Sequence, residues 1–411
     1  MNLRLFTSES VTEGHPDKIA DQISDAVVDA VLADDAGGRA ACETLVTTDL
    51  AVVAGEVSRS SHLDVPGLVR RILFEAGYES PRSGIDLKSW AVSSTLHGQS
   101  PEIAAAVDAR RGGGDTKPLG AGDQGMMFGF ACDDTPEFMP APISVAHALV
   151  KRLSEARRNG EISWLRPDGK SQVTFAYDND WKPLRITAVV LSAQHDECDA
   201  QGNELTQQRI AEELRARVID PVLPPEFVSG HPDEITYHIN PSGSFTRGGP
   251  HEDTGLTGRK IIVDTYGGMG RHGGGAFSGK DPTKVDRSGA YAARWAAKNL
   301  VAAGVASRCE VQLAYAIGVA EPVQVWVDSF GTARHGLDDG RLSEVVGRVF
   351  DFRPEAIIRD LGLAGPVFER TASYGHFGRS PRQAVAHGRD VQLFGWERID
   401  RVDRIVSALN L

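Results

Sequence analysis

The spacing of apolar and polar positions along the 411-residue chain predicts a mixture of helices and strands. Apolar residues from Ile19 to Val31 recur every four positions, which predicts an amphipathic helix over 16–33. Because strand-like runs often follow one another directly, the pattern favours α+β layers over a strictly alternating parallel sheet. Further helices are expected near 141–158, 206–219, 287–303, 341–350 and 354–361, and strands near 40–47, 50–57, 171–177, 185–194, 234–239, 261–267, 309–318 and 323–330.

The length of the chain indicates more than one domain. A chain of 411 residues exceeds what one hydrophobic core usually serves, so two or three domains are expected. Each third of the chain mixes a few strands with one or two helices, which gives a loose threefold rhythm without an identity repeat. Residues 97–122 are rich in glycine and proline and predict a long loop, either a functional lid or a disordered segment.

Composition then narrows the class of protein. A net charge of -12 argues against a general nucleic-acid binder, which needs a basic surface for phosphates. No run of about 18 apolar residues exists, and the first residues lack the apolar core of a signal peptide. The four cysteines are far apart and form no CxxC pair, so we expect reduced, mostly buried thiols in a cytoplasmic protein.

One segment carries the opposite charge. Residues 259–298 hold eight basic side chains and three acidic ones, a local excess of +5 that suggests a focused site for a small, strongly anionic ligand. The alternative is a solvated helix face, which we favour for Arg294 and Lys298 taken alone. The basic residues are Arg259, Lys260, Arg271, Lys280, Lys284, Arg287, Arg294 and Lys298.

The segment 14–18 (Gly-His-Pro-Asp-Lys) lies where the first predicted helix begins. Free backbone N–H groups and the positive end of the helix dipole gather there and favour a phosphate group. His15 could donate to a phosphate or leaving-group oxygen, and Asp17 could hold Mg²⁺, which needs few carboxylates beside substrate phosphates. The alternative is that both residues only cap the helix.

The glycine-rich segment 267–282 contains two motifs that mislead. A GxGxxG pattern over 268–273 matches the dinucleotide fingerprint, but about thirteen residues separate it from the next predicted helix. The pattern over 274–280 nearly matches a P-loop, but Asp281 follows Lys280 where a Ser or Thr is needed for Mg²⁺. The physical inference that survives is that glycines let the backbone approach phosphates and Lys280 supplies charge.

Several further positions could carry chemistry or be structurally ordinary. Asp123 lies in the glycine-rich turn 120–125, and Asp168 and Lys170 are predicted on a turn before a strand. Two adjacent cations, Arg259 and Lys260, precede the apolar run predicted as strand 261–267. Glu43 and Glu56 interrupt apolar strands, where they either face water or bind a cation or an amine.

Three separate motifs, taken together, resemble the methionine adenosyltransferase (S-adenosylmethionine synthetase) family. They are the segment Phe6–Lys18, the sequence GAGDQG at 120–125 and the sequence GGGAFSGKDP at 273–282, and the similarity runs from about residue 4 to about residue 378. The resemblance implies an α+β fold of three structurally similar domains of mixed β-sheets with helices. The implied parts are an N-terminal domain at 1–101, a mobile lid and linker at 102–119, a central domain at 120–246, and a C-terminal domain at 247–411 with a variable tail.

The resemblance also implies an activity and its partners. The chain would make S-adenosylmethionine from ATP, L-methionine and water, by attack of sulfur on the ribose 5′ carbon and hydrolysis of the triphosphate to pyrophosphate and phosphate. It would use two Mg²⁺ per site and K⁺, and form a homo-oligomer, a dimer of dimers with active sites between subunits, without nucleic acid or membrane partners. The alternatives are an ATPase, a nucleotide-binding regulatory protein or a small-molecule kinase.

Residue by residue, the resemblance implies the following roles. Catalysis falls to His15, Lys170, Arg259, Lys280 and Asp286. ATP binding falls to His15, Asp123, Asp168, Lys170, Ser244, Phe245, Asp253, Arg259, Lys260, Ala276 and Lys280. Methionine binding falls to Glu56, Gln99, Asp123, Asp253 and Lys284, with Glu56 and Gln99 contributed by a partner subunit. Asp17 and Asp286 would hold Mg²⁺, and Glu43 would belong to a K⁺ site.

One position departs from the family's pattern. Ser244 stands where the family has an arginine, although Phe245, which could stack on adenine, is present. We hypothesise that Arg247 partly substitutes for the missing cation.

Overall fold

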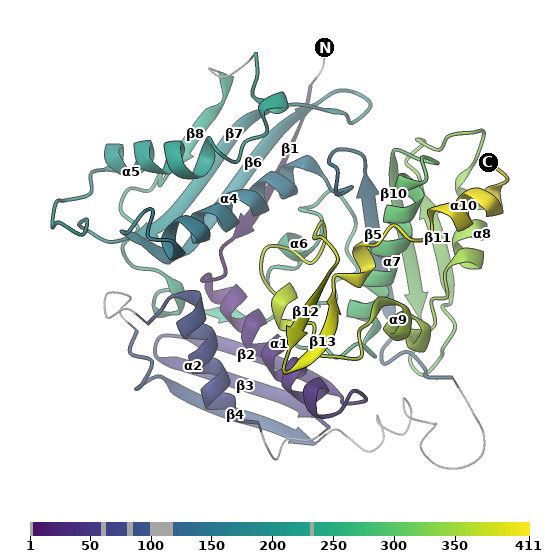
Figure 1. Cartoon of the computed structure of the whole chain (residues 1–411), viewed down its shortest axis with the longest axis horizontal. Coiled ribbons are helices and arrows are strands. Elements are labelled where there is room, and N and C mark those ends of the chain that lie inside the picture. The colour runs from purple at the N-terminus through teal and green to yellow at the C-terminus, as the bar shows by residue number, and fades with distance from the viewer. Residues whose placement is uncertain (1–2, 59–62, 80–84, 99–117, 231–233) are drawn as a thin grey trace.

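The computed structural model describes residues 3–58, 63–79, 85–98, 118–230 and 234–411. The described residues form three larger sheets and one two-stranded sheet, and Figure 1 shows the larger sheets around a central group of helices that includes α1, α6 and α7. The architecture is α+β with mixed parallel and antiparallel pairing, which confirms the fold class expected from the sequence. No helix in these ranges is long and apolar enough to cross a membrane.

The first sheet has the order β4-β3-β2-β9. Its strands are β4 (Ala91–Gly98), β3 (Leu50–Val57), β2 (Ala40–Thr47) and β9 (Gly255–Leu256), and its helices are α1 (Pro16–Asp34) and α2 (Val65–Ala76). Alternate residues of β2 are buried, while Glu43 points to the exposed face. The alternation therefore leaves one face of the sheet open on the side away from α1.

The second sheet has the order β1-β6-β7-β8. It consists of β1 (Arg4–Val11), β6 (Leu165–Tyr177), β7 (Pro183–His195) and β8 (Thr236–Ile239). A separate hydrophobic core joins it to α4 (Ala141–Arg158), α5 (Gln207–Leu214) and the following π-helical turn Arg215–Ile219. The pairing of β6 with β7 is irregular between Leu165 and Gly169, at the point where Asp168 lies.

The third sheet has the order β11-β10-β5 and carries the C-terminal helices. Gly129 of β5 lies so close to α7 that an added Cβ would stand 2.0 Å from the Ala293 carbonyl carbon. The sheet consists of β5 (Gly125–Cys132), β10 (Arg308–Tyr315) and β11 (Gln324–Asp328), with α7 (Val285–Ala302), α8 (Asp339–Val349), α9 (Pro354–Leu361), α10 (Val402–Leu409) and the hairpin β12 (Arg382–Ala386)–β13 (Arg389–Leu393).

Strands from distant parts of the sequence complete each sheet. The N-terminal strand β1 pairs with β6, β9 pairs with β2, and β5 pairs with β10. Each of the three larger sheets therefore combines segments that are far apart in the sequence.

Most predicted elements are present with small changes of boundary, and one is wrong. Residues 261–267 do not form a strand, because Ile261–Asp264 is a single helical turn, α6, closed by the Asp264 N–H on the Lys260 carbonyl (2.8 Å). A short apolar run fits either structure. The predicted helix 206–219 divides into α5 and a π-helical turn. The predicted loop at 97–122 lies mostly outside the described residues, and positions 97–98 belong to β4.

Candidate active site

The first part of the site is the start of α1. His15 is the N-cap, and its Nδ1 accepts the Asp17 N–H at 3.2 Å, so His15, but not the Asp17 side chain, caps the helix. Because Nδ1 is an acceptor, the proton of the neutral ring is on Nε2, which leaves that nitrogen as a donor. Burial, with Lys260 and Lys170 nearby, lowers the pKa of His15 to about 3. The ring is therefore a neutral hydrogen-bond donor at physiological pH.

Asp17 lies two residues further along, in the first turn of α1, and is almost fully buried. Its Oδ2 accepts the Lys260 ammonium at 2.5 Å, its Oδ1 accepts the Leu256 N–H at 3.0 Å, and the Arg259 guanidinium stands 3.7 Å away. Burial alone would raise the pKa of Asp17, but the hydrogen bonds from Lys260 and Leu256 lower it below its ordinary value. The carboxylate is therefore ionised and held by two cations. Arg259 and Lys260 precede α6 and not a strand, which corrects the sequence prediction.

The second part is the glycine-rich loop before α7. The Lys280 ammonium donates to Asp286 Oδ2 at 2.6 Å, and the Lys284 ammonium donates to Asp281 Oδ2 at 2.6 Å. Asp286 stands in the first turn of α7, where a negative charge complements the helix dipole. The loop therefore presents two lysines, each already paired with a carboxylate.

These two parts are neighbours. An added Cβ on Gly258 would stand 2.5 Å from the Ala276 Cβ, so the segment before α6 packs against the glycine-rich loop. Glu43 lies within electrostatic range of Lys280 and Asp21: burial raises its pKa, Lys280 opposes that effect, and Asp21 adds to it. The Ala41 backbone forms an isolated bridge with Lys280. Residues from three distant segments thus meet around one group of cations.

A third part lies at the β6 irregularity. Asp168 is buried; its Oδ2 accepts the Gly249 N–H at 2.9 Å, and its Oδ1 has no hydrogen-bond partner in the described structure. Burial raises the pKa of Asp168 to about 6, with a smaller contribution from Asp253. Asp168 and Lys170 lie within β6, so their prediction as turn residues before a strand is wrong. Phe245 is close by, because a Cβ on Gly248 would stand 2.8 Å from its ring.

The remaining predicted residues lie at the edge of these groups. Asp123 is exposed and accepts the Gln124 N–H at 2.7 Å, while the preceding Gly122 donates to the Thr283 carbonyl of the glycine-rich loop. Ser244 is exposed, and Arg247 is paired with Glu252 at 2.8 Å. Glu56 is half-buried in β3, where it is paired in register with His97. Gln99 lies outside the described residues.

The sequence did not predict the stripe of carboxylates that holds these loops. Four aspartates of α1, spaced four residues apart, lie on one face, and all four are buried. Each accepts a backbone N–H from a residue between 237 and 340 positions away. Their spacing was a signal, because charged residues rarely occupy the buried face of a helix without partners. The donors are Leu256 to Asp17, Gly258 to Asp21, Gly279 to Asp25, and Phe368 with Glu369 to Asp29.

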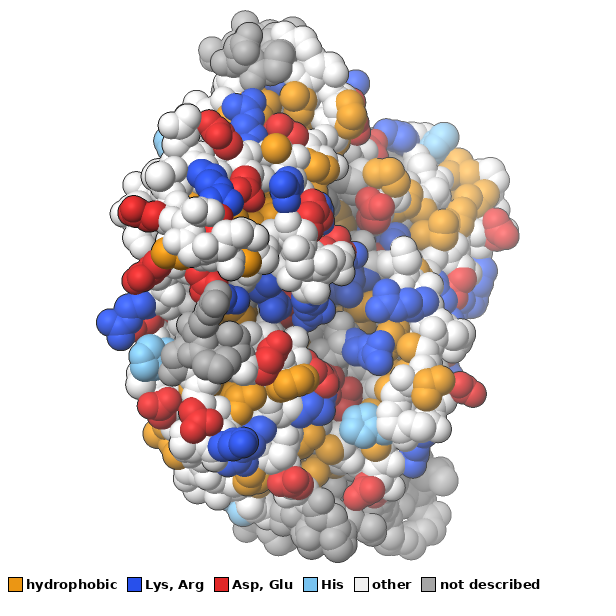
Figure 2. Space-filling model, turned by 60° about the vertical axis from the view of Figure 1, so that its left-hand side comes forward, with side chains coloured by type: hydrophobic (Ala, Val, Ile, Leu, Met, Phe, Trp, Pro, Cys, Tyr) orange, Lys and Arg blue, Asp and Glu red, His pale blue; other side chains and the backbone are white. Residues whose placement is uncertain are grey.

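The basic patch predicted from 259–298 is only partly a surface feature. Figure 2 shows Lys and Arg side chains gathered across the hollowed middle of one face. Arg294 and Lys298 are buried, however, and both donate to Glu397 Oε2, at 3.0 Å and 2.7 Å. The interpretation of these two residues as a solvated helix face is therefore wrong, because they form an internal ion pair with the C-terminal segment.

The carboxylates that could bind a cation in this site stand singly and do not form a cluster. No group of three or more His, Cys, Asp or Glu side chains converges as a cation site within the described ranges. Asp17 and Asp286 each hold a lysine ammonium instead. This donor set fits Mg²⁺ that arrives with a phosphate-bearing ligand, because Mg²⁺ keeps waters and needs only one or two carboxylates beside phosphate oxygens.

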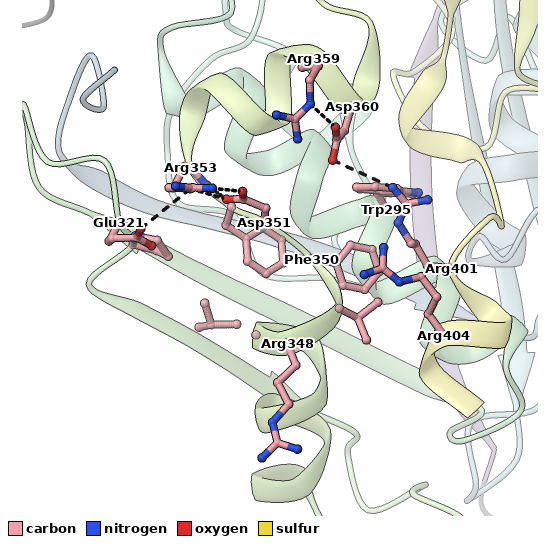
Figure 3. A pocket seen from close by; sticks show the side chains of 15 residues that line it. Trp295, Glu321, Arg348, Phe350, Asp351, Arg353, Arg359, Asp360, Arg401 and Arg404 are labelled. Carbon is pink, nitrogen blue, oxygen red and sulfur yellow. Dashed lines mark hydrogen bonds and ion pairs between the residues drawn. The ribbon is translucent and has the colours of Figure 1, made fainter. Parts of the chain in front are cut away.

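A cavity of about 470 Å³ lies elsewhere, between the ends of α8, α9 and α10. Figure 3 shows arginines around the aromatic side chains of Trp295 and Phe350. Asp351 pairs with Arg353, and Asp360 pairs with Arg359 at 2.8 Å. None of the predicted site residues lines this cavity, whose wall holds five arginines and three acidic residues.

Family models match the chain in three consecutive parts. The N-terminal domain of S-adenosylmethionine synthetase matches residues 3–101, the central domain matches 118–245, and the C-terminal domain matches 247–387. The chain belongs to the S-adenosylmethionine synthetase family. The S-adenosylmethionine synthase of Clostridium tetani is 53% identical over 411 residues, which cover 99% of this chain and 100% of the relative. That of Clostridium botulinum is 52% identical over 407 residues, which cover 98% of each. All four cysteines are free thiols, as predicted.

Proposed function

We propose that this chain is an S-adenosylmethionine synthase, which joins ATP to L-methionine and hydrolyses the resulting triphosphate. Identity above 50% along the full chain to two synthases carries this proposal. The clustered cations around α1 and the glycine-rich loop support it, because a triphosphate leaving group needs concentrated positive charge. A plain ATPase or a regulatory nucleotide-binding protein is not favoured.

The triphosphate would occupy the space between the start of α1 and the glycine-rich loop. Lys260 and Lys280 would exchange their carboxylate partners for phosphate oxygens, and Arg259, which is half exposed, would turn toward the same oxygens. His15 would donate its Nε2 proton to the departing oxygen as a neutral hydrogen-bond donor. Lys170 and Ala276 would border the same space.

The adenosine would lie at the irregularity of β6. The unpartnered Oδ1 of Asp168 is an acceptor that needs a donor, and a ribose hydroxyl or an adenine amine can supply one. Phe245 would stack on the base. Ser244 removes one cation found in the family, and Arg247 would take over its contact by leaving Glu252.

The methionine would bind where the turn 120–125 meets the glycine-rich loop. Asp123 and Asp253 would receive its ammonium, and Lys284 would receive its carboxylate. Glu56 and Gln99 would be contributed by a partner subunit in a homo-oligomer, a dimer of dimers with the active sites between subunits. We retain the division into three contiguous domains with a lid at 102–119, and a cytoplasmic location, as parts of the same proposal.

Asp17 and Asp286 would hold two Mg²⁺, and Glu43 would belong to a K⁺ site. When bound, these cations neutralise the charge that develops on the triphosphate. The thioether sulfur of methionine is already nucleophilic, so no general base is needed. The residues of the chain would therefore accelerate the reaction by orienting the two substrates and by stabilising the opposite charges that develop on them. The carboxylates near the methionine subsite favour the developing sulfonium, and the lysines retain the triphosphate for hydrolysis.

The test is to incubate the purified protein with ATP, Mg²⁺ and K⁺, with and without L-methionine, and identify products by mass spectrometry. We expect S-adenosylmethionine only with methionine, with equal amounts of phosphate and pyrophosphate. Phosphate release without a sulfonium product would replace the proposal with an ATPase. The Lys280→Gln variant, which loses a cation at the triphosphate, is expected to lose product, whereas Lys151→Gln on α4 is the control.

A further inference from the structure

Lys280 is held by its backbone as well as by its side chain. The preceding Gly279 donates its N–H to Asp25 Oδ1 at 2.9 Å and accepts the Cys42 N–H at 2.8 Å, and the following Asp281 donates its N–H to the Ala40 carbonyl. These contacts fix the loop on both flanks of Lys280 between α1 and β2. The carbonyl of Lys280 itself is bound by a different residue.

That residue is Arg287, in the first turns of α7, with no exposed side-chain surface. Its Nη1 donates to Asp25 Oδ1 at 2.6 Å and to the Lys280 carbonyl at 3.1 Å. Its Nη2 donates to Asp25 Oδ2 at 2.9 Å and to Thr371 Oγ1 at 3.1 Å, and its Nε donates to the Tyr291 hydroxyl at 3.1 Å. The five N–H groups of a guanidinium thus meet five acceptor contacts on four residues.

The two consecutive residues Asp286 and Arg287 hold opposite ends of the same lysine. Asp286 receives the ammonium of Lys280, and Arg287 binds its carbonyl. When a phosphate draws the ammonium away from Asp286, only the backbone contacts still fix where the side chain starts. The position of the ammonium in the ligand-bound state therefore depends on the Arg287–Asp25 pair.

We propose that Arg287 is a positioning residue for Lys280: paired with Asp25, it fixes the lysine backbone so that the ammonium reaches the triphosphate. This inference depends on the proposed function in one respect, which is that the anion bound by Lys280 is a triphosphate. A lysine at position 287 would keep the charge but could not form the two-pronged contact with Asp25 and still reach the Lys280 carbonyl.

The same helix contains a matched control. Arg294 also has no exposed side-chain surface and makes a two-pronged ion pair, with Glu397, through Nε at 3.1 Å and Nη2 at 3.0 Å. Its other donors bind the carbonyls of Phe130, Glu137 and Phe138, none of which belongs to the glycine-rich loop. Replacing Arg294 therefore perturbs an equally buried pair without touching Lys280.

The experiment compares Arg287→Lys with Arg294→Lys. Urea denaturation measures stability, steady-state kinetics give kcat and KM, and calorimetry measures the binding of tripolyphosphate. We expect both variants to be less stable than the wild type. Only Arg287→Lys should bind tripolyphosphate more weakly, by about 10- to 100-fold, and have a lower kcat, because a displacement of a catalytic group by about 1 Å has an effect of this size. Equal losses in the two variants, or unchanged binding in Arg287→Lys, would overturn the proposal.

A double-mutant cycle adds a readout that a purely structural role would not change. In the Lys280→Gln background, Arg287→Lys should weaken tripolyphosphate binding no further, because its effect passes through the lysine. If Arg287→Lys does not fold, the neutral pair Asp25→Asn with Arg287→Gln replaces it, with Glu397→Gln and Arg294→Gln as the matched pair. Wild-type protein that binds tripolyphosphate but makes no S-adenosylmethionine would refute the proposed function and leave this test intact.

Discussion

Replacing Asp168 with asparagine should raise the free energy of unfolding at neutral pH by about 0–2 kcal/mol and lower activity. Burial raises the pKa of Asp168 from its ordinary 3.8 to about 6. That shift of about 2 pKa units corresponds to about 3 kcal/mol, by which the native state disfavours the ionised carboxylate. Asparagine removes this cost and keeps an acceptor for the Gly249 N–H. Its NH₂ group would lie where Oδ1 has no partner, and burying an unpaired donor costs about 1–3 kcal/mol.

The pH dependence of the stability difference between Asp168→Asn and the wild type separates the electrostatic contribution from the effect of the unpaired amide. Because the native pKa is raised, the native state binds more protons than the unfolded chain, so the wild-type protein loses this stability as pH rises from about 4 through about 6. Of the about 3 kcal/mol of stability that the wild-type protein loses in this way, about 2 kcal/mol is lost between about pH 4.5 and about pH 8. We therefore expect the free energy of unfolding of Asp168→Asn, relative to wild type, to increase by about 2 kcal/mol over this interval.

The assay is urea denaturation at several pH values, with Asp180→Asn as the control. Asp180 is an exposed aspartate in the turn between β6 and β7. A difference between Asp168→Asn and wild type that stays constant across this pH range would refute the argument that burial disfavours the carboxylate. At pH 7.5 the same variant should raise the KM for ATP by about 10- to 100-fold, the loss of one hydrogen bond to a charged group.

Three further predictions use other features of the structure. Because the pKa of His15 in the ligand-free protein is lowered to about 3, kcat/KM for ATP should show no inflection from this ring between about pH 5.5 and about pH 8, and an inflection that His15→Gln abolishes would contradict this assignment. Gly279→Ala should destabilise more than Gly274→Ala in urea: both glycines have positive φ, but only at 279 would the Cβ collide, 1.9 Å from the Cys42 carbonyl oxygen, and equal losses would contradict the clash. Glu397→Gln should cost about 3–5 kcal/mol because it leaves two buried cations unpaired, whereas Glu344→Gln at an exposed pair should change little; a small loss at 397 would contradict that burial argument.

The residues of the candidate site that the sequence indicated are those that lie in local motifs. Glycine beside lysine, and a histidine and an aspartate at a helix start, indicated phosphate binding, and the structure brings Asp17, Lys260 and Lys280 into one region. The pairing of Arg287 with Asp25 joins positions 262 residues apart and has no local signature. For the same reason the stripe on α1 was not predicted: its partners are backbone N–H groups, which every residue but proline carries.

Two of the strands that the sequence did not predict, β1 and β5, have a common cause. Strand β1 is rich in Thr, Ser and Glu, and takes its conformation from the β6 ladder and not from its own apolar content. Strand β5 contains two glycines, which weaken any local strand signal, yet Gly129 is needed for the close approach of α7. Tertiary contacts thus decided the structure of both segments.

The pairing of Asp17 and of Asp286 with a lysine explains how the proposed site can exist in two states, without and with its ligand. Without ligand, Lys260 neutralises Asp17 and Lys280 neutralises Asp286, so neither of these carboxylates is left without a cation. An incoming Mg²⁺–triphosphate carries both signs of charge: its cation can take the carboxylates while its oxygens take the ammonium groups. Binding then exchanges partners and creates no unpaired charge, and it requires that the lysine backbone stay in place while the ammonium moves. That requirement is why the Arg287–Asp25 pair belongs to the function of the site as well as to its stability.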